Sequence, residues 1–409
     1  MVTMVLFSNK SRPYHLGTYP LERLARDPDI VAVELARKRV RRQTPKRSVD
    51  EGFNATLEKY RRIFHSLRDD QPAAATAPVP DDPQRRMIDL KGSAYFLNAS
   101  QVGICKLSES CWLDGTVPLR HTHAVVVLVK HGRMPENGTL ANAWVEDCIT
   151  QAASLRAYEI AISIANHVQQ MGFSAVAHDA VNGDLDLARL VVLAGLGVRS
   201  GERVLNPYLD GDYAVAAISI DYDLAIDQPL QANTLKNARG IAYWLGYGGC
   251  TSGLERWRRQ RRPTHFSKFA METVDRVDRP TTLIIDDEVP RVPKRASFFE
   301  RPVHGDLGKK TQHERTRFAF KHPLAKAMTD QIGAMVAHQD GAVGESMSAS
   351  CADAAENTRA LKTLSYFLGA ELTGVCEIPD YAWYSHDGNG EPVACHHRYA
   401  VVMLIDQEY

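Results

Sequence analysis

The 409-residue sequence lacks the features that define several large classes of protein. Lys and Arg together number 49, as do Asp and Glu, so no net charge draws the chain to nucleic acid or to an acidic membrane. Local basic runs at 37–42 and 256–262 are interpreted as solvated helix faces. The longest apolar runs, AVVVLV and AVVML, are far shorter than the roughly 20 residues of a membrane-spanning helix. With only a short apolar stretch and no cleavage site at the N-terminus, we predict a cytoplasmic protein that binds neither nucleic acid nor membranes.

Cysteine-based sites are also missing from the sequence. No two of the seven cysteines form a CxxC pair, which argues against a zinc ribbon and against the cysteine run of a ferredoxin. An odd number of cysteines without a signal peptide favours free thiols over disulfides. His121 and His123 alternate along a predicted strand, but no paired cysteine or HExxH spacing accompanies them. We therefore predict no metal site and interpret the two histidines as hydrogen-bonded polar groups at a strand end.

The pattern of apolar residues predicts strands that alternate with helices. A helix is indicated by Ile160, Ile164 and Val168 at helical spacing, with Gly172 as its terminator. Buried strands are predicted at 102–107, 121–129 and 173–178, and a further strand ends near Leu224. Because 44% of the residues are hydrophobic, the chain can bury a large core. The predicted fold class is α+β, with layers of helices packed on a sheet.

The sequence contains an internal repeat. KGSAYFLNASQVGICKL at 91–107 matches KTLSYFLGAELTGVCEI at 362–378 in seven of seventeen positions, at an offset of 362 − 91 = 271 residues. The strand HTHAVVVLV at 121–129 then matches HRYAVVMLI at 397–405 at an offset of 276, so the second copy has five extra residues in a loop. The first copy continues for a further 95 residues that have no counterpart in the second. A pair of strands without its helices cannot bury both faces, so the second copy is predicted to be truncated.

The repeat, a Pro- and Ala-rich stretch and the flexible stretch GAVGESMSAS divide the chain into predicted segments. These are an N-terminal helical arm at 1–70, a linker at 71–89, a first domain at 90–230, an insert and connecting loop at 231–340, a linker at 341–356, and the start of a second copy at 357–409.

The segment from Met171 to Asp227 closely resembles the core of the corrinoid-dependent reductive dehalogenases. It contains, in order, MGF before a strand, the turn AGLG, the loop NPYL, and a strand that ends in DYDLA. Outside this segment, RPYHLGTYPLERL, SFFERPVHGD and YSHDG look like the cytoplasmic, non-respiratory branch of the family. Members of that branch carry a duplicated corrinoid-type domain, related to nitroreductase-like sandwiches, followed by a ferredoxin-like module.

The resemblance implies chemistry that belongs to the second copy. Cobalamin is held base-off, two 4Fe–4S clusters deliver electrons, and a Tyr with basic neighbours protonates the product as halide leaves. The first copy is expected to be silent. After DYDLAID an active unit would carry a CxxCxxCxxxCP run, whereas this sequence has the single Cys250, so the first copy lacks the four thiolates of a cluster. The resemblance thus implies an N-terminal portion of a longer enzyme, or a decayed or frameshifted form, and this chain alone is expected to bind neither cofactor.

Four residues are candidates for a substrate pocket. Phe298 and Phe299 lie between the two copies, where they could wall a pocket for a halogenated aromatic, with core packing as the alternative. Tyr384 and His386 are the titratable pair in the longer loop of the second copy, with a plain surface loop as the alternative. No catalytic residue is predicted in this chain.

Three functions are compatible with the sequence. The first is part of a reductive dehalogenase that removes halide from organohalides, with a missing or separately encoded C-terminal half as its partner. The second is a non-catalytic corrinoid-fold scaffold or interaction module. The third is a flavin-dependent reductase that uses the related nitroreductase-like fold. Formation of a homodimer stays open.

Overall fold

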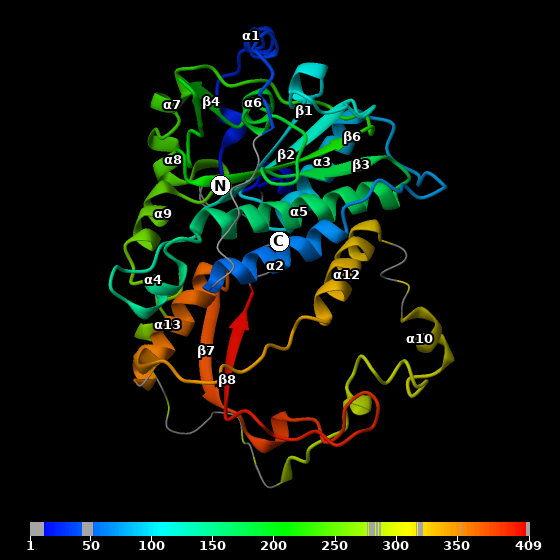
Figure 1. Ribbon diagram of the computed structural model, residues 1–409, viewed down its shortest axis with the longest axis vertical. Coiled ribbons are helices and arrows are strands. Elements are labelled where there is room, and N and C mark those ends of the chain that lie inside the picture. Colours follow the sequence, from blue (N-terminus) through cyan, green and yellow to red (C-terminus); the bar gives the residue numbers. More distant parts are fainter. Residues whose placement is uncertain are drawn as a thin grey trace, which may run out of the picture.

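The computed structural model describes residues 12–42, 52–275, 277, 283, 285, 288–315, 317, 322–351 and 353–405. A four-stranded sheet lies at the centre of its larger part, with α5 (Ile149–Gln170) against one face and α6 (Leu187–Leu193) against the other (Figure 1). The fold is α+β. Within the described part of the chain, no helix combines the length and the apolar character needed to cross a membrane. The parts of the predicted terminal segments at 1–11, 43–51 and 406–409 lie outside the described residues.

The central sheet has the strand order β1-β2-β6-β3, and every neighbouring pair is antiparallel. Strand β2 is buried on both faces, which explains its unbroken apolar sequence. Val125, Val127 and Val129 face the core that includes α5, whereas Ala124, Val126 and Leu128 face the core that includes α6. The strands are β1 (Gln101–Lys106), β2 (His123–Lys130), β3 (Ala175–His178) and β6 (Tyr213–Ile220), and a separate short ribbon pairs β4 (Val198–Ser200) with β5 (Arg203–Leu205).

Helix α5 is the centre of the helical layer on one face of the central sheet. Two helices from distant parts of the sequence, α2 (Gly52–Ser66) and α12 (Pro323–Val336), pack on its outer side (Figure 1). The buried side chain of Gln331 on α12 accepts a hydrogen bond from Ser163 Oγ on α5 at 2.7 Å. A segment of the second repeat is thereby fastened directly to the first domain.

The N-terminal segment around α1 (Ile30–Leu35) is tied to the α6 side of the central sheet by two arginine side chains. The guanidinium of Arg189, which is 1% exposed, donates to the backbone carbonyls of Ser110, Arg37 and Lys38. Arg26 donates in the same way to Gly195 and Gln228, at 2.9 Å each. These bonds bring the start of the chain against the turn AGLG and the segment that follows β6.

The sequence repeat is also a repeat of structural elements. Helix α3 (Pro83–Phe96) recurs as α13 (Ala354–Phe367), and β1 recurs as β7 (Leu372–Glu377), both at the offset of 271. The short helix η4 (Glu109–Cys111) recurs as η10 (Asp380–Ala382) at the same offset, and β8 (Tyr399–Leu404) follows β2 at 276. The start of α12 also lies 323 − 52 = 271 residues after the start of α2. The structural repeat therefore begins at α12, inside the segment 231–340 that the sequence assigns to the insert.

Both predicted linkers are shorter than expected, because helices begin inside them. Helix α3 starts at Pro83, within 71–89, since Asp82 accepts a hydrogen bond from the backbone N–H of Gln84 and proline suits the first helical turn. Helix α13 starts at Ala354, within 341–356, where Asp353 provides the same cap. Helix α6 is capped by Asp186, whose side chain accepts from the N–H of Arg189. Among the described residues, the remaining α-helices are α4 (Leu140–Val145), α7 (Thr234–Asn237), α8 (Ile241–Leu245), α9 (Gly253–Gln260) and α10 (Lys309–Glu314).

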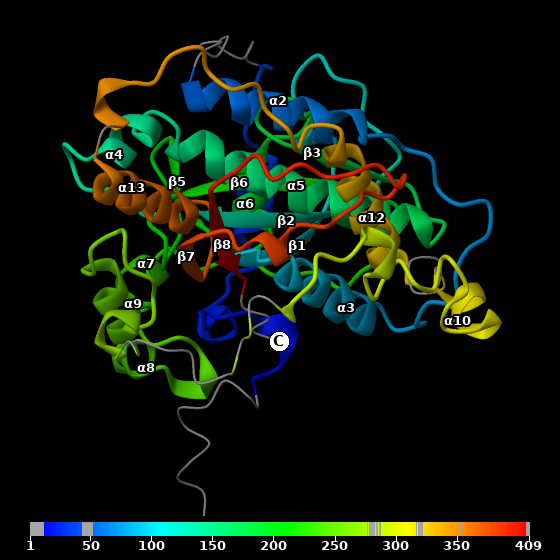
Figure 2. The same ribbon diagram turned by 90° about the horizontal axis from the view of Figure 1, so that it is seen from below.

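The two hairpins of the repeat differ in burial. Strands β7 and β8 form a separate two-stranded sheet away from the central one, with α13 beside α4 (Figures 1 and 2). Leu128 of β2 is fully buried, whereas its counterpart Leu404 of β8 is 56% exposed. Val402 and Met403 are similarly exposed. Among the described residues, the outer edge of β8 pairs with no strand, although the matching edge of β2 pairs with β6.

A glycine repeated in both hairpins tests this difference. A methyl group at Gly103 would overlap the backbone carbonyl oxygen of Ala194 and lie 3.0 Å from Leu196 Cγ, whereas at the equivalent Gly374 nothing lies within 4 Å. We expect Gly103→Ala to lower the free energy of unfolding by about 3 kcal/mol, because backbone atoms cannot move aside cheaply. Gly374→Ala should change it by less than about 0.5 kcal/mol. Urea unfolding of both variants measures the difference, and equal losses would show that the hairpins are packed alike.

Candidate functional site

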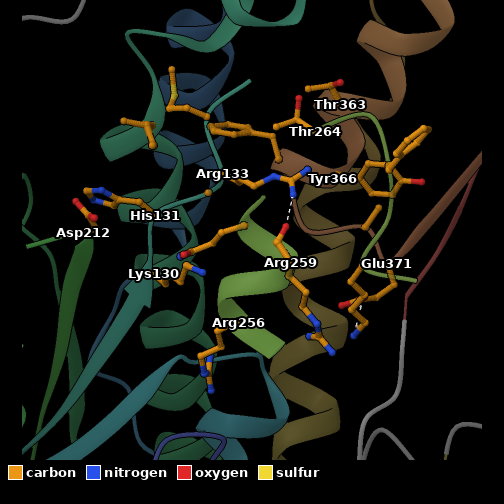
Figure 3. Close-up of a pocket in the computed structure, with 18 residues that line it drawn as sticks. Lys130, His131, Arg133, Asp212, Arg256, Arg259, Thr264, Thr363, Tyr366 and Glu371 are labelled. Atoms are coloured by element: carbon orange, nitrogen blue, oxygen red, sulfur yellow. Dashed lines mark hydrogen bonds and ion pairs between the residues drawn. The ribbon is translucent and has the colours of Figure 1, made fainter. Parts of the chain in front are cut away.

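A basic pocket lies between the two repeats. It has a volume of about 530 Å³ and is bounded by the residues after β2, by α9 and the loop that follows it, and by the C-terminal end of α13. Figure 3 shows Lys130, Arg133, Arg256 and Arg259 on the side formed by β2 and α9, with Tyr366 and Glu371 across from them. Five lining side chains are basic and two, Asp212 and Glu371, are carboxylates.

The arginines of the pocket are held in place by fixed neighbours. Arg133 donates to the backbone carbonyls of Arg259 at 2.6 Å and Pro263 at 2.8 Å, and the first of these bonds is drawn in Figure 3. The guanidinium of Arg256 lies 3.7 Å from the ring centroid of Tyr19 and donates to the carbonyl of Thr18 at 3.0 Å. Such contacts reduce the conformational entropy that a ligand would have to remove, so the cationic groups are preorganised.

Lys130 combines exposure to solvent with a crowded environment. It is the exposed last residue of β2, and its ammonium forms no ion pair within the described part of the chain. The pocket walls nevertheless surround it, so desolvation lowers its pKa from the usual value, and the nearby charges of Arg256, Arg133 and Arg259 lower it further. The ammonium therefore lies in a pocket where positive charge is in excess.

The second repeat closes the pocket through α13. The ring of Phe367 packs so closely on Gly132 that a methyl group there would lie 2.9 Å from Phe367 Cδ2. An ion pair of 2.7 Å joins Lys268 to Glu371, just beyond α13. The pocket thus exists because the helix of one repeat is seated on the strand end of the other.

The four residues predicted for a substrate pocket lie outside the lining of this one. The backbone brings their two segments together, since the N–H of Lys294 donates to the carbonyl of His386 at 2.9 Å and Arg291 donates to the carbonyl of Tyr384 at 2.7 Å. The side chains of Phe298 and Phe299 are 69% and 84% exposed and contact each other edge to face at 5.4 Å. Tyr384 and His386 are also exposed. Their assignment to a substrate pocket stays a prediction.

Two buried histidines form a hydrogen-bonded network at one end of the central sheet. His121 bonds through Nδ1 to Ser219 Oγ at 2.7 Å and through Nε2 to Ser174 Oγ at 2.6 Å, and His178 Nε2 reaches the same Ser219 hydroxyl at 2.8 Å. Burial lowers the pKa of His121 and that of His178. His123 contacts Thr122 Oγ1 at 2.9 Å instead. His121 and His123 therefore have separate sets of partners.

We expect histidines whose pKa is lowered by burial to make the folded protein less stable in acid. The clearest case is His167 on α5, whose pKa is lowered by burial from 6.5 to about 4. Because the folded pKa lies below the unfolded one, the unfolded chain binds more protons between these values, and stability falls as pH drops from about 6.5 to about 4. Urea unfolding across this range measures the fall. His167→Gln should reduce it, whereas the same change at the exposed His313 should not, and equal slopes in both variants would contradict this cause.

The cysteines form no disulfides. All seven are free, with Cys105, Cys111, Cys148 and Cys250 buried. Within the described ranges, no three His, Cys, Asp or Glu side chains are grouped so as to hold a metal ion. A 4Fe–4S cluster requires four thiolates, and these residues do not supply them.

Comparison with known proteins relates the chain to one enzyme group. No protein-family model matches it, and no curated protein matches it. One solved structure is that of a reductive dehalogenase, and it suggests a mechanism for B12-dependent dehalogenation. That protein is 37% identical over 98% of this chain, with a TM-score of 0.87. The catabolic reductive dehalogenase NpRdhA matches with 37% identity over 99% of the chain and the same TM-score. Its complex with 3-bromo-4-hydroxybenzoic acid gives a TM-score of 0.85.

The matches are long in this chain and partial in the relatives. The chain covers 58% of the length of each of these structures. Agreement in both sequence and fold over nearly every residue of this chain is far above the level at which a fold alone is shared. The chain is therefore homologous to part of these reductive dehalogenases.

Proposed function

We propose that this chain forms part of a cobalamin- and iron-sulfur-dependent reductive dehalogenase that acts on halogenated aromatic compounds. The observation that carries the proposal is the 37% identity over 98% of the chain, at a TM-score of 0.87, to a B12-dependent relative. The relative NpRdhA has been seen with a brominated hydroxybenzoic acid, which supports an aromatic substrate class. The proposed protein is cytoplasmic and non-respiratory.

The residues present supply structure and not cofactor ligands in this proposal. The described cysteines do not fit an iron–sulfur cluster, so no step of the chemistry is assigned to them. What the chain supplies is one complete α+β unit and the opening helix and hairpin of a second. The outer edge of β8 corresponds to the edge of β2 that pairs with β6 in the first unit. The exposed Leu404 corresponds to the buried Leu128. An antiparallel strand placed there as β6 is placed on β2 would complete the second sheet.

A chimera tests the proposal. In it, this chain replaces its counterpart in the solved NpRdhA, and the rest of that enzyme is kept. We expect the purified and reconstituted chimera to show corrinoid absorbance and to release bromide from 3-bromo-4-hydroxybenzoic acid. A folded chimera that binds corrinoid but releases no bromide would contradict the dehalogenase assignment and favour a scaffold. Flavin absorbance in place of corrinoid would favour the nitroreductase-like alternative.

A matched pair of variants makes the chimera test sharper. If the completed second unit packs like the first, Gly374 would meet a backbone as Gly103 meets Ala194, so Gly374→Ala should be tolerated in this chain alone and should destabilise the chimera. Gly333→Ala on α12 is the control, because a methyl group there meets nothing within 4 Å. Equal behaviour of the two variants in the chimera would show that the second unit is packed differently from the first.

A further inference from the structure

We propose that the basic pocket between β2, α9 and α13 binds a small organic phosphate of nucleotide size, with the phosphate beside Lys130 and Arg256 and the organic body against Phe266 and Phe367. The proposal concerns the interface between the two repeats. It does not depend on dehalogenation, and its test does not require a corrinoid.

The charge of the pocket calls for an anion. Glu371 is paired with Lys268 at 2.7 Å, and Arg259 with Glu255 at the same distance. Lys130, Arg133 and Arg256 form no ion pair within the described residues, and Arg133 is bonded to backbone carbonyls instead. Asp212 lies close enough to raise the pKa of Lys130, yet the neighbouring arginines outweigh it and the net shift is downward. Three cations without an ion pair in one concave site match the charge of a phosphate monoester at neutral pH better than that of a single carboxylate.

Two of the residues that line the pocket also have nitrogen atoms without a hydrogen-bond partner. Arg256 Nε and His131 Nε2 are buried and have no hydrogen-bond partner. A buried polar group without a partner is costly, and most such groups in proteins are satisfied. The burial of His131 lowers its pKa, so its imidazole stays neutral at neutral pH and can donate or accept a hydrogen bond according to its tautomer. A phosphate oxygen can accept from Arg256 Nε and from His131 Nε2 in the tautomer that carries its proton there.

The size and the apolar part of the pocket indicate more than an inorganic ion. About 530 Å³ falls in the range of small-molecule sites and far exceeds what phosphate alone would fill. Met134, Ile149, Phe266 and Phe367 contribute apolar surface to the lining. An arrangement of cations beside aromatic rings suits a ligand with a charged head and a planar body, such as a nucleoside monophosphate.

Calorimetric titration of the intact chain with AMP tests the proposal, with inorganic phosphate and 4-hydroxybenzoate as comparison ligands. We expect AMP to bind at least tenfold more tightly than phosphate. Lys130→Met should weaken AMP binding at least tenfold, whereas Lys106→Met, at the exposed end of neighbouring β1, should leave it unchanged. Phe266→Leu should weaken AMP binding and leave phosphate binding unaltered. The thermal unfolding of each variant shows that it is folded.

Each contrary result overturns a defined part of the proposal. Equal affinities for AMP and phosphate would show that the pocket does not bind the organic body of the ligand. Tighter binding of 4-hydroxybenzoate than of AMP would show that the pocket prefers a carboxylate to a phosphate. No saturable binding of any of the three, or equal weakening by Lys130→Met and Lys106→Met, would refute the site itself.

Discussion

Replacing Arg61 by methionine is expected to lower the free energy of unfolding by about 3–5 kcal/mol. Arg61 lies on α2, its side chain is 7% exposed, and it forms a direct ion pair with the fully buried carboxylate of Asp179 at the end of β3. The variant leaves that carboxylate with only the N–H groups of Val181 and Asn182 as donors. An uncompensated buried charge is costly even where the intact pair contributes little net stability.

The neighbouring Arg62 is the matched control. Both arginines pair with Glu58, one turn earlier on the helix, but the side chain of Arg62 is 71% exposed. Solvent screens such a pair, so Arg62→Met should change the free energy of unfolding by less than about 1 kcal/mol. Urea unfolding of the two variants gives the comparison. Similar losses at the two positions would mean that α2 is not seated on the first domain as described.

The central sheet was predictable because its strands are buried on both faces. The predicted strands at 102–107 and 121–129 lie within one or two residues of β1 and β2, and the helix ended by Gly172 is α5, which reaches Gln170. A strand with helices on both sides must be apolar at nearly every position, so its sequence carries a strong local signal. The element boundaries were less certain, because caps such as Asp82 act over only two or three residues.

The basic pocket could not be predicted, since its residues come from separate parts of the chain. The sequence interpretation of 256–262 as a solvated helix face is wrong for Arg256, whose guanidinium packs on the ring of Tyr19, and it did not anticipate that Arg256 and Arg259 line the pocket. Helical spacing shows which residues share a face, but it does not show that the loop after β2 and the end of α13 lie opposite that face. One signal was available: the repeat places α13 as the counterpart of α3, so a contact between the repeats could have been anticipated.

The two equivalent leucines of the repeat provide the second large effect. Leu128→Ala should lower the free energy of unfolding by about 3–5 kcal/mol, because it removes a fully buried side chain from a packed core and leaves a cavity. Leu404→Ala should change it by less than about 0.5 kcal/mol, because Leu404 is 56% exposed. Urea unfolding measures both variants in this chain, and a large loss for Leu404→Ala here would contradict the open hairpin.

The same two variants in the NpRdhA chimera test whether burial sets the cost of each leucine substitution. If the added residues cover β8 as the first domain covers β2, the cost of Leu404→Ala should rise toward that of Leu128→Ala, because the hydrophobic contribution follows the area removed from water. The cost of Leu128→Ala should stay unchanged, since its surroundings are already complete. A Leu404 cost that stays near zero in a folded chimera would mean that the second hairpin keeps an exposed face, and the parallel between the two repeats would end at their sequences.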